Sequence, residues 1–445
     1  MKDILFKYML KKYKIRIFIF LMFLIVLLIT VKTINFRPLA FKYLPDDIKL
    51  IIKIALKEIN PRAALNDYNV VFLPETQEIL LDIKKTQLDF LNENSKSSID
   101  GFYLDLYDKK NILISDMSGF FYIFKKKLLS NKSILSVNDA KNINSNLKIS
   151  SILKTLDTFT SDKENRIYIS YVTKDNKNCK ILNLASAEKN LEYLKFNLLF
   201  QSKECAKLIL GGRIQKYELD GNSGVLLTTS DTIPDVPNNN PQNKESIFGK
   251  ILFINESTKD VHVFSSGHRN PQGLLVDGEL VLSTEHGPRG GDEINSIIRG
   301  KNYGWPLASY GNLYTNEILT NPFLQSHRKS DFEEPIYSFI PSIGISEIIK
   351  IDNNFSDSWK DNFLISSLRD QSIYRVRFDE NYTKILFSEK IFVQSKIRDM
   401  KYDYDGKSIL LALQANDPHT IMSIKLSPNK LFKKQFKLYN KKWLN

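Results

Sequence analysis

Short hydrophobic runs recur along most of the chain, and clusters of Asp, Asn, Gly and Lys separate them. Typical runs are GFYLDLYD at 101–108, NRIYISYV at 165–172 and GLLVDGELVLSTE at 273–285. β-Branched and aromatic residues dominate these runs, which is typical of strands joined by tight turns. No long helix alternates regularly with them, which argues against a doubly wound parallel sheet. About 360 residues of such short strands predict an all-β domain, either a propeller or a large sandwich.

The N-terminal part of the chain follows a different pattern. Residues 17–31 (IFIFLMFLIVLLITV) carry no charge, and as a helix they are about 22 Å long, shorter than the roughly 30 Å hydrocarbon core. Flanking Lys and Arg side chains can extend this reach by snorkelling. Six basic residues and one Asp within residues 1–16 place that segment in the cytoplasm. An uncleaved anchor is favoured over a cleaved signal peptide, because no A-x-A-like site follows.

These patterns predict five segments with different roles. The bulk of the chain would lie outside the cytoplasm, attached by a single membrane span. The segments are a cytoplasmic basic tail at 1–16, a transmembrane anchor at 17–32, a linker with a short amphipathic helix at 33–66, the β-domain at 67–430 and a C-terminal tail at 431–445.

The composition narrows the possible classes of function. The chain has 445 residues, of which 42% are hydrophobic and 25% charged, so wholesale disorder and a polytopic membrane protein are excluded. The net charge is +13, but its excess is partly local to the first 16 residues and no long basic run follows. We therefore expect no nucleic-acid binding. Cys179 and Cys205 are too few for a disulfide scaffold or a Cys-based zinc site, and they either pair or stay buried as thiols.

The segment 267–306 has a composition that packing alone does not require. It reads GHRNPQGLLVDGELVLSTEHGPRGGDEINSIIRGKNYGWP. Three glycines in the turn 286–293 permit sharp or positive-φ backbone, and Asp292 and Glu293 add carboxylates. A turn that directs carbonyl and carboxylate oxygens outward suits a hard cation such as Ca²⁺. A well-capped loop between two strands is the alternative interpretation.

This segment closely resembles the pyrroloquinoline-quinone-dependent aldose dehydrogenases, the glucose/sorbosone dehydrogenase family. The resemblance continues through 333–346, 359–378 and 396–406. It implies a six-bladed β-propeller with the cofactor over the central channel, here preceded by one N-terminal transmembrane helix. It also implies oxidation of a small sugar or alcohol by a protein of the bacterial inner membrane whose bulk lies in the periplasm. The electron acceptor is not evident from the sequence.

Pyrroloquinoline quinone carries three carboxylates and an ortho-quinone, so converging cations and a divalent ion suit it. The resemblance also implies backbone ligands for the cofactor calcium at Gly287 and Pro288, and for a separate structural calcium at Glu293 and Tyr303. The implied cofactor-binding residues are Arg269, Asn270, His286, Asp292, Ser342, Arg369, Lys396 and Arg398.

The general base of the family is missing from its expected position. Aldose oxidation removes a hydroxyl proton, and the resemblance implies a His at the position that Ile209 occupies in CAKLILGGRI. The catalytic candidates that remain are Asp231, which matches the carboxylate that orients this base, and Arg269. Three interpretations stay open: an enzyme that uses another base, such as Asp231 or His286; a degenerate propeller that binds a ligand or partner; and an incorrect alignment at Ile209.

Overall fold

The computed structural model describes the greater part of the β-domain. The predicted tails, anchor and linker at 1–16, 17–32, 33–66 and 431–445 lie outside the described residues. Within the described part, no helix has both the length and the hydrophobicity that crossing a bilayer requires. The described residues are 81–92, 101–175, 177–232, 239–312, 323–324, 326–414 and 419–427.

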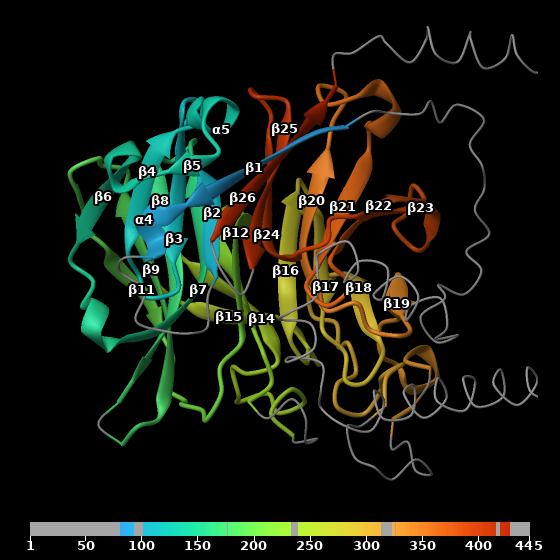
Figure 1. The fold of residues 1–445 in the computed structure, drawn as a ribbon. Helices are drawn as coiled ribbons and strands as arrows, with labels where there is room; N and C mark the ends of the chain where they lie inside the picture. The colour runs from blue at the N-terminus through green and yellow to red at the C-terminus, as the bar shows by residue number, and fades with distance from the viewer. Residues whose placement is uncertain are drawn as a thin grey trace, which may run out of the picture. The chain divides into compact units, whose positions relative to one another are not determined.

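Six sheets, antiparallel except for the short outer strands β5 (Ile134–Leu135) and β10 (Tyr193–Leu194), form the blades of the domain (Figure 1). The innermost strand of each sheet contacts the innermost strands of the two neighbouring sheets, so the six form a closed ring. This confirms the predicted all-β six-bladed propeller. The innermost strands are β2 (Phe102–Leu106), β7 (Ile152–Ser161), β12 (Gly211–Leu219), β16 (Pro271–Asp277), β20 (Ile345–Ile351) and β24 (Lys396–Asp403).

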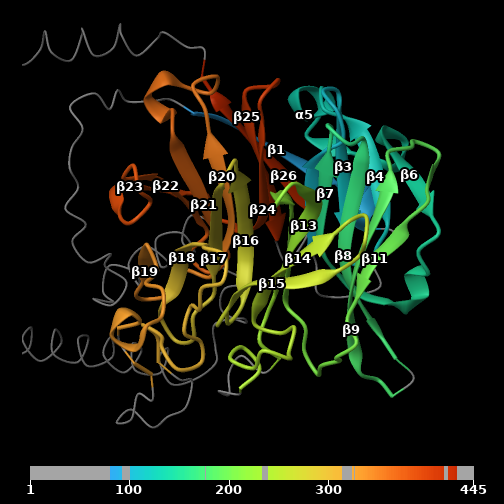
Figure 2. The same ribbon diagram turned by 180° about the vertical axis from the view of Figure 1, so that it is seen from behind.

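The other strands lie outward from these in each blade, as the reverse view also shows (Figure 2). The first three blades add β3 (Asn111–Asp116), β4 (Phe121–Lys125), β6 (Ala140–Ser145) and β10 (Tyr193–Leu194); β8 (Arg166–Lys174), β9 (Lys180–Glu188) and β11 (Asn197–Gln201); and β13 (Asn222–Thr229), β14 (Lys250–Asn255) and β15 (Val261–Ser266). The last three add β17 (Leu280–Glu285), β18 (Asp292–Ser296) and β19 (Tyr337–Phe339); β21 (Asn362–Ser367), β22 (Ser372–Phe378) and β23 (Ile385–Phe392); and β25 (Ser408–Gln414), β26 (Thr420–Leu426), β1 (Leu81–Leu88) and β5 (Ile134–Leu135).

Short helices occur only between strands of the described part. They are α4 (Asp89–Asn92), α5 (Leu128–Asn131) and four 3₁₀ turns at Val137–Asp139, Ile149–Ser151, Arg328–Ser330 and Asp357–Trp359.

The ring closes through the sixth blade. β1 pairs antiparallel with β26, from Leu81 opposite Leu426 to Gln87 opposite Thr420. A strand from the start of the domain thus completes the blade formed by its last strands, which leaves no gap between first and sixth blades.

Packing between neighbouring blades explains the strand sequences. In β8, the six residues from Ile167 to Val172 are all buried, because the middle strand of a blade is covered on both faces. Such strands form continuous hydrophobic runs rather than alternating ones, as the sequence shows. In the second blade, Cys179 and Cys205 form a disulfide with their Cα atoms 5.7 Å apart. Of the two alternatives left by the sequence, pairing is therefore the one observed.

Candidate functional site

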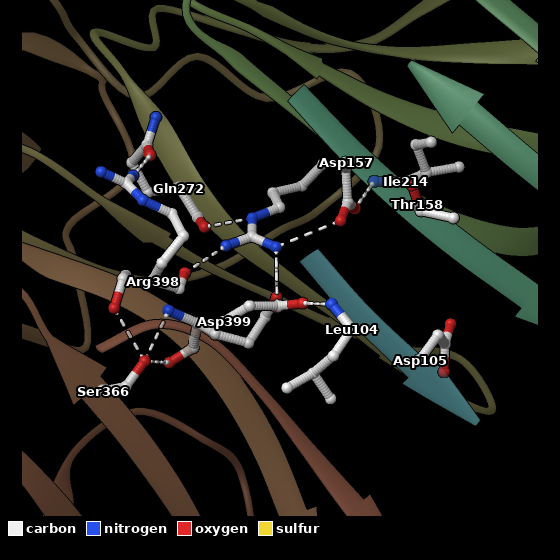
Figure 3. Close-up of polar contacts among 12 residues, drawn as sticks. Leu104, Asp105, Asp157, Thr158, Ile214, Gln272, Ser366, Arg398 and Asp399 are labelled. Carbon is white, nitrogen blue, oxygen red and sulfur yellow. Dashed lines mark hydrogen bonds and ion pairs between the residues drawn. The ribbon is translucent and has the colours of Figure 1, made fainter. Parts of the chain in front are cut away.

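A cluster of buried charges lies on the propeller axis (Figure 3). Nη1 of Arg213, on β12, lies 2.9 Å from the Glu347 carboxylate, 3.0 Å from that of Asp399 and 3.2 Å from that of Asp157. These four residues, called here the Arg213 cluster, come from four different blades and are each less than 5% exposed. Nε of Arg213 also donates to the carbonyl of Gln272 on a fifth blade. The cluster therefore links the innermost strands electrostatically.

Two carboxylates of the cluster, those of Glu347 and Asp157, have raised pKa values. Burial raises the pKa of Glu347 to about 7 and that of Asp157 to about 6, although the charge of Arg213 opposes both shifts. This cluster is not evident from the sequence, because each member is a single charged residue within a hydrophobic strand. The signal was present in TLDTFT (155–160), GGRIQ (211–215) and ISEIIK (345–350), but it becomes meaningful only once these strands form one ring.

Two cations adjoin the cluster without a carboxylate partner. Arg398 receives the Arg213 Nη2 hydrogen bond at its carbonyl oxygen, and its guanidinium contacts only amide oxygens in the described structure: Gln414 at 2.7 and 3.1 Å and Gln272 at 3.4 Å. Burial, together with the charge of Arg398, lowers the pKa of Lys154 to about 8. Neither cation forms an ion pair with any described residue. We call Arg398 and Lys154 the anion site; Arg398 was predicted from the sequence, and Lys154 was not.

The anion site is connected to the segment 269–292. The Gln272 amide that accepts from Arg398 donates to Oδ1 of Asn270 at 2.8 Å. The guanidinium of Arg269 lies over the ring of Trp305 and donates to the carbonyls of His286 at 3.0 Å and Gly287 at 2.8 Å. The structure therefore brings together residues that are more than 100 positions apart in the chain.

The turn after β17 is held by its own polar groups. Gly290 and Gly291 have φ values of +86° and +72°, as the sequence predicted. The Asp292 carboxylate accepts from the backbone N–H of Gly287 at 3.1 Å, Gly344 at 2.7 Å and Ile345 at 3.0 Å. Asp292 thus fixes the turn and ties the fourth blade to the start of the fifth.

His286 lies at the start of this turn with one ring nitrogen available. Its Nε2 bonds the carbonyl of Ile345. Because a carbonyl can only accept, Nε2 carries the hydrogen and Nδ1 retains its lone pair. Burial lowers the pKa of His286, and the charges of Arg269 and Arg398 act in the same direction, whereas the charge of Asp292 and the hydrogen bond to Ile345 oppose this shift. The imidazole is therefore neutral at pH 7 and can accept a proton.

The four predicted metal-binding residues line a single small cavity of about 10 Å³, together with Glu285. They are Gly287, Pro288, Glu293 and Tyr303. This is room for about one water-sized body. Burial, then the charge of Glu285, raises the pKa of Glu293 well above its usual range. A bound cation would oppose this shift by favouring the carboxylate, but Arg269 also lines the cavity and already supplies positive charge there.

The turn carbonyls suit calcium less well than the carboxylates. The Gly287 oxygen already accepts from the Arg269 guanidinium, and the Pro288 oxygen accepts from Ser342 Oγ at 3.3 Å. A second cation at the Gly287 oxygen would lie close to that guanidinium. In the described ranges, no three His, Cys, Asp or Glu residues are placed to share a metal.

The remaining predicted residues fall into two groups. Arg369 and Lys396 are exposed, in the segment before β22 and at the start of β24 respectively. Asp231 is fully buried and accepts from Trp305 Nε1 at 2.8 Å. Ile209 is 3% exposed and packs in a hydrophobic cluster with Leu156.

This geometry defines the class of protein: a six-bladed propeller with cations grouped at one end of its channel. Residues 66–421 match the Glucose / Sorbosone dehydrogenase family. The chain therefore belongs to this family, as the sequence predicted.

Two curated relatives illustrate the extent of the likeness. Aldose sugar dehydrogenase YliI of Escherichia coli (strain K12) is 30% identical over 216 residues, which cover 47% of this chain and 54% of that protein. Quinoprotein glucose dehydrogenase B of Acinetobacter calcoaceticus is 33% identical over 128 residues, which cover 24% and 27%. The chain thus spans about half, or less, of the length of the curated relatives it matches.

Solved structures share the fold. The apo-form of soluble aldose sugar dehydrogenase from Escherichia coli superposes with a TM-score of 0.62 at 20% identity, over 79% of this chain and all of that chain. The pyrroloquinoline-quinone-bound aldose sugar dehydrogenase from Streptomyces coelicolor gives 0.55 at 16% identity, over 79% and 99%.

Proposed function

We propose that this chain is a membrane-anchored, periplasmic dehydrogenase that oxidises a sugar or alcohol with pyrroloquinoline quinone. The observation that carries the proposal is the anion site beside a neutral histidine. Arg398 and Lys154 have no carboxylate partner among the described residues, and the charge of Arg398 acts on His286. Family membership and the quinone-dependent relatives support the same activity.

The cations would bind the cofactor through its carboxylates. Buried, unpaired cations gain most from an anionic ligand, because charge-assisted hydrogen bonds strengthen where water is excluded. Arg398 and Lys154 would hold one end of the molecule, with Arg369 and Lys396 at the rim. When bound, the quinone supplies a two-electron acceptor. The residues Arg269 and Asn270 would then lie at the quinone side, held by Gln272 and by the turn carbonyls.

His286 would replace the missing base. Its Nδ1 lone pair would accept the hydroxyl proton of the substrate, while the Nε2 hydrogen bond to Ile345 fixes the ring. Such general-base assistance is worth roughly 10²–10⁴-fold in rate. Asp231 cannot take this role, because it is fully buried and bonded to Trp305.

Calcium and the cellular location belong to the same proposal. Glu293 is the better donor for a calcium ion, which would support the turn that carries His286, because Glu285 already accepts from the backbone N–H groups of Arg269 and Asn270 and contacts His268. The disulfide between Cys179 and Cys205 is consistent with an oxidising compartment such as the periplasm, as is the predicted anchor at 17–32.

The test is reconstitution of the full chain, in detergent, with pyrroloquinoline quinone and Ca²⁺. We expect a saturable change in quinone absorbance, and reduction of an artificial electron acceptor by at least one sugar or alcohol in a panel. His286→Gln should retain quinone binding and lose turnover by about 10²-fold or more. Turnover that is unchanged in His286→Gln would eliminate this residue as the base.

One observation favours a second function, that of a ligand-binding propeller without chemistry. The family's base position is not only substituted but filled by Ile209, which packs in a hydrophobic core. This function predicts quinone binding without turnover on any panel member. An Ile209→His variant that gains aldose oxidation would show that the position is the vacant base site.

A further inference from the structure

A second and larger cavity lies at the other end of the propeller. It has a volume of about 510 Å³ and lies where the first and sixth blades meet, beside α5. Along β24, Arg398 is the third residue and Asp403, which lines this cavity, is the last. The two positions are therefore roughly 16 Å apart along the strand. In Figure 1, α5 lies at the opposite end of the blades from the loop that follows β17.

The lining of this cavity is strongly basic, and we call it the basic pocket. Its acidic lining residue is Asp403, which is paired with Lys126 at 2.7 Å. The other five lysines form no ion pair with any described residue. The six lining lysines are Lys109, Lys110, Lys125, Lys126, Lys127 and Lys425.

Five unpaired ammonium groups around one concavity raise the local potential, because a concave, low-dielectric wall focuses the field. A multiply charged anion would relieve their repulsion. Lysine binds phosphate as a compact point charge. The inner wall also offers two buried leucines, Leu129 and Leu410, and the hydroxyls of Ser408 and Ser423. An anionic head and a less polar body can thus be accommodated together.

We propose that the basic pocket binds a phosphate-bearing molecule. This site is separate from the proposed quinone site, because it lies at the other end of the channel and shares no residue with it. The phosphate could come from a free phosphate compound or from the head group of an anionic phospholipid, and the two sources are distinguished below.

The test uses the full chain in phosphatidylcholine nanodiscs, with pyrophosphate as the probe. Isothermal titration calorimetry measures its binding. The variant Lys109→Gln, Lys125→Gln, Lys127→Gln removes three exposed, unpaired charges from the pocket. Its matched control, Lys163→Gln, Lys203→Gln, Lys207→Gln, removes three exposed lysines elsewhere. Quinone titration of each variant checks that the propeller remains folded.

We expect one saturable site for pyrophosphate, at least tenfold weaker in the pocket variant and less than twofold weaker in the control. Phosphatidylglycerol is then added to the nanodisc. If it competes with pyrophosphate for the parent chain but not for the pocket variant, the ligand is a lipid head group. Saturable binding without such competition identifies a free phosphate compound. Absence of saturable binding, or an equal loss in both variants, overturns the proposal.

Discussion

Two groups of charge lie next to each other in the channel, and they differ in one respect. In the Arg213 cluster, one guanidinium meets three carboxylates within 3.2 Å. In the anion site, Arg398 meets only amide oxygens, and Lys154 has no ion-pair partner in the described structure. Arg213 and Arg398 are even joined by a hydrogen bond. Arg213 therefore has a structural role in which its charge is compensated, whereas the uncompensated charge of Arg398 supports the binding role proposed above.

The largest effect should come from Arg213→Met. Removing the guanidinium leaves three buried carboxylates with no cation in direct contact, although the charge of Lys401 still acts on them. Breaking a buried ion pair in this way costs about 3–5 kcal/mol. Urea denaturation should show this loss in the free energy of unfolding. If Arg213→Met lowers the free energy of unfolding by no more than Arg398→Met does, the two arginines do not differ in their contribution to stability.

Arg398→Met should reverse the pattern. Because its guanidinium compensates no carboxylate, we expect less than about 1 kcal/mol of lost stability. Quinone affinity should instead fall about 10- to 100-fold, the loss of one or two charge-assisted hydrogen bonds. Absorbance titration measures this, with Lys163→Met as a control for an exposed lysine that is not assigned to the quinone site. A variant that is unstable but binds normally would contradict the assignment.

The difference between these groups also explains what the sequence could reveal. The β-strand texture is a local pattern, so an all-β domain was predictable from it, and the family resemblance then distinguished the six-bladed propeller from a large sandwich. The glycine-rich turn is also local, and it permits the positive φ found at Gly290 and Gly291. Arg398 was found because it lies in a family motif. Lys154 and the Arg213 cluster come from strands far apart in the chain, and only closure of the ring brings them together. The proposed base is a third case. The isoleucine at position 209 is visible in the sequence, but the role of the His286 Nδ1 depends on the hydrogen bond from Nε2 to the Ile345 carbonyl on the next blade.

Lys154 should give a smaller effect that depends on pH. With a pKa of about 8, it is largely charged at pH 7 and loses its charge as the pH rises. Quinone affinity should therefore fall between pH 7 and 9 in the parent chain. Lys154→Met should weaken binding roughly fivefold at pH 7, about 1 kcal/mol, and should flatten this pH dependence. A slope that persists in the variant would assign the titration to another group.

The smallest effect is expected from Glu347→Gln in the Arg213 cluster. The informative quantity is the sign of the change in stability between low and high pH. Burial raises the pKa of Glu347 from 4.5 to about 7. A group whose pKa is raised on folding contributes stability below its unfolded value and loses that contribution as the pH rises through the folded value. The parent chain should therefore lose stability between about pH 4.5 and 7 from this group. Glutamine resembles the protonated form and does not titrate, so the variant should gain relative to the parent as the pH rises.

Urea denaturation of both proteins at pH 5 and pH 8 gives this difference directly, with Glu389→Gln as a control. Glu389 is half exposed in its side chain and pairs with Arg375 on the outer strand of the fifth blade, so its substitution should show no comparable trend. The opposite sign, a variant that loses stability relative to the parent at pH 8, would mean that attraction to Arg213 outweighs burial. Glu347 would then be ionised throughout this range. The Arg213 cluster would carry one more negative charge next to the anion site than it does with Glu347 protonated.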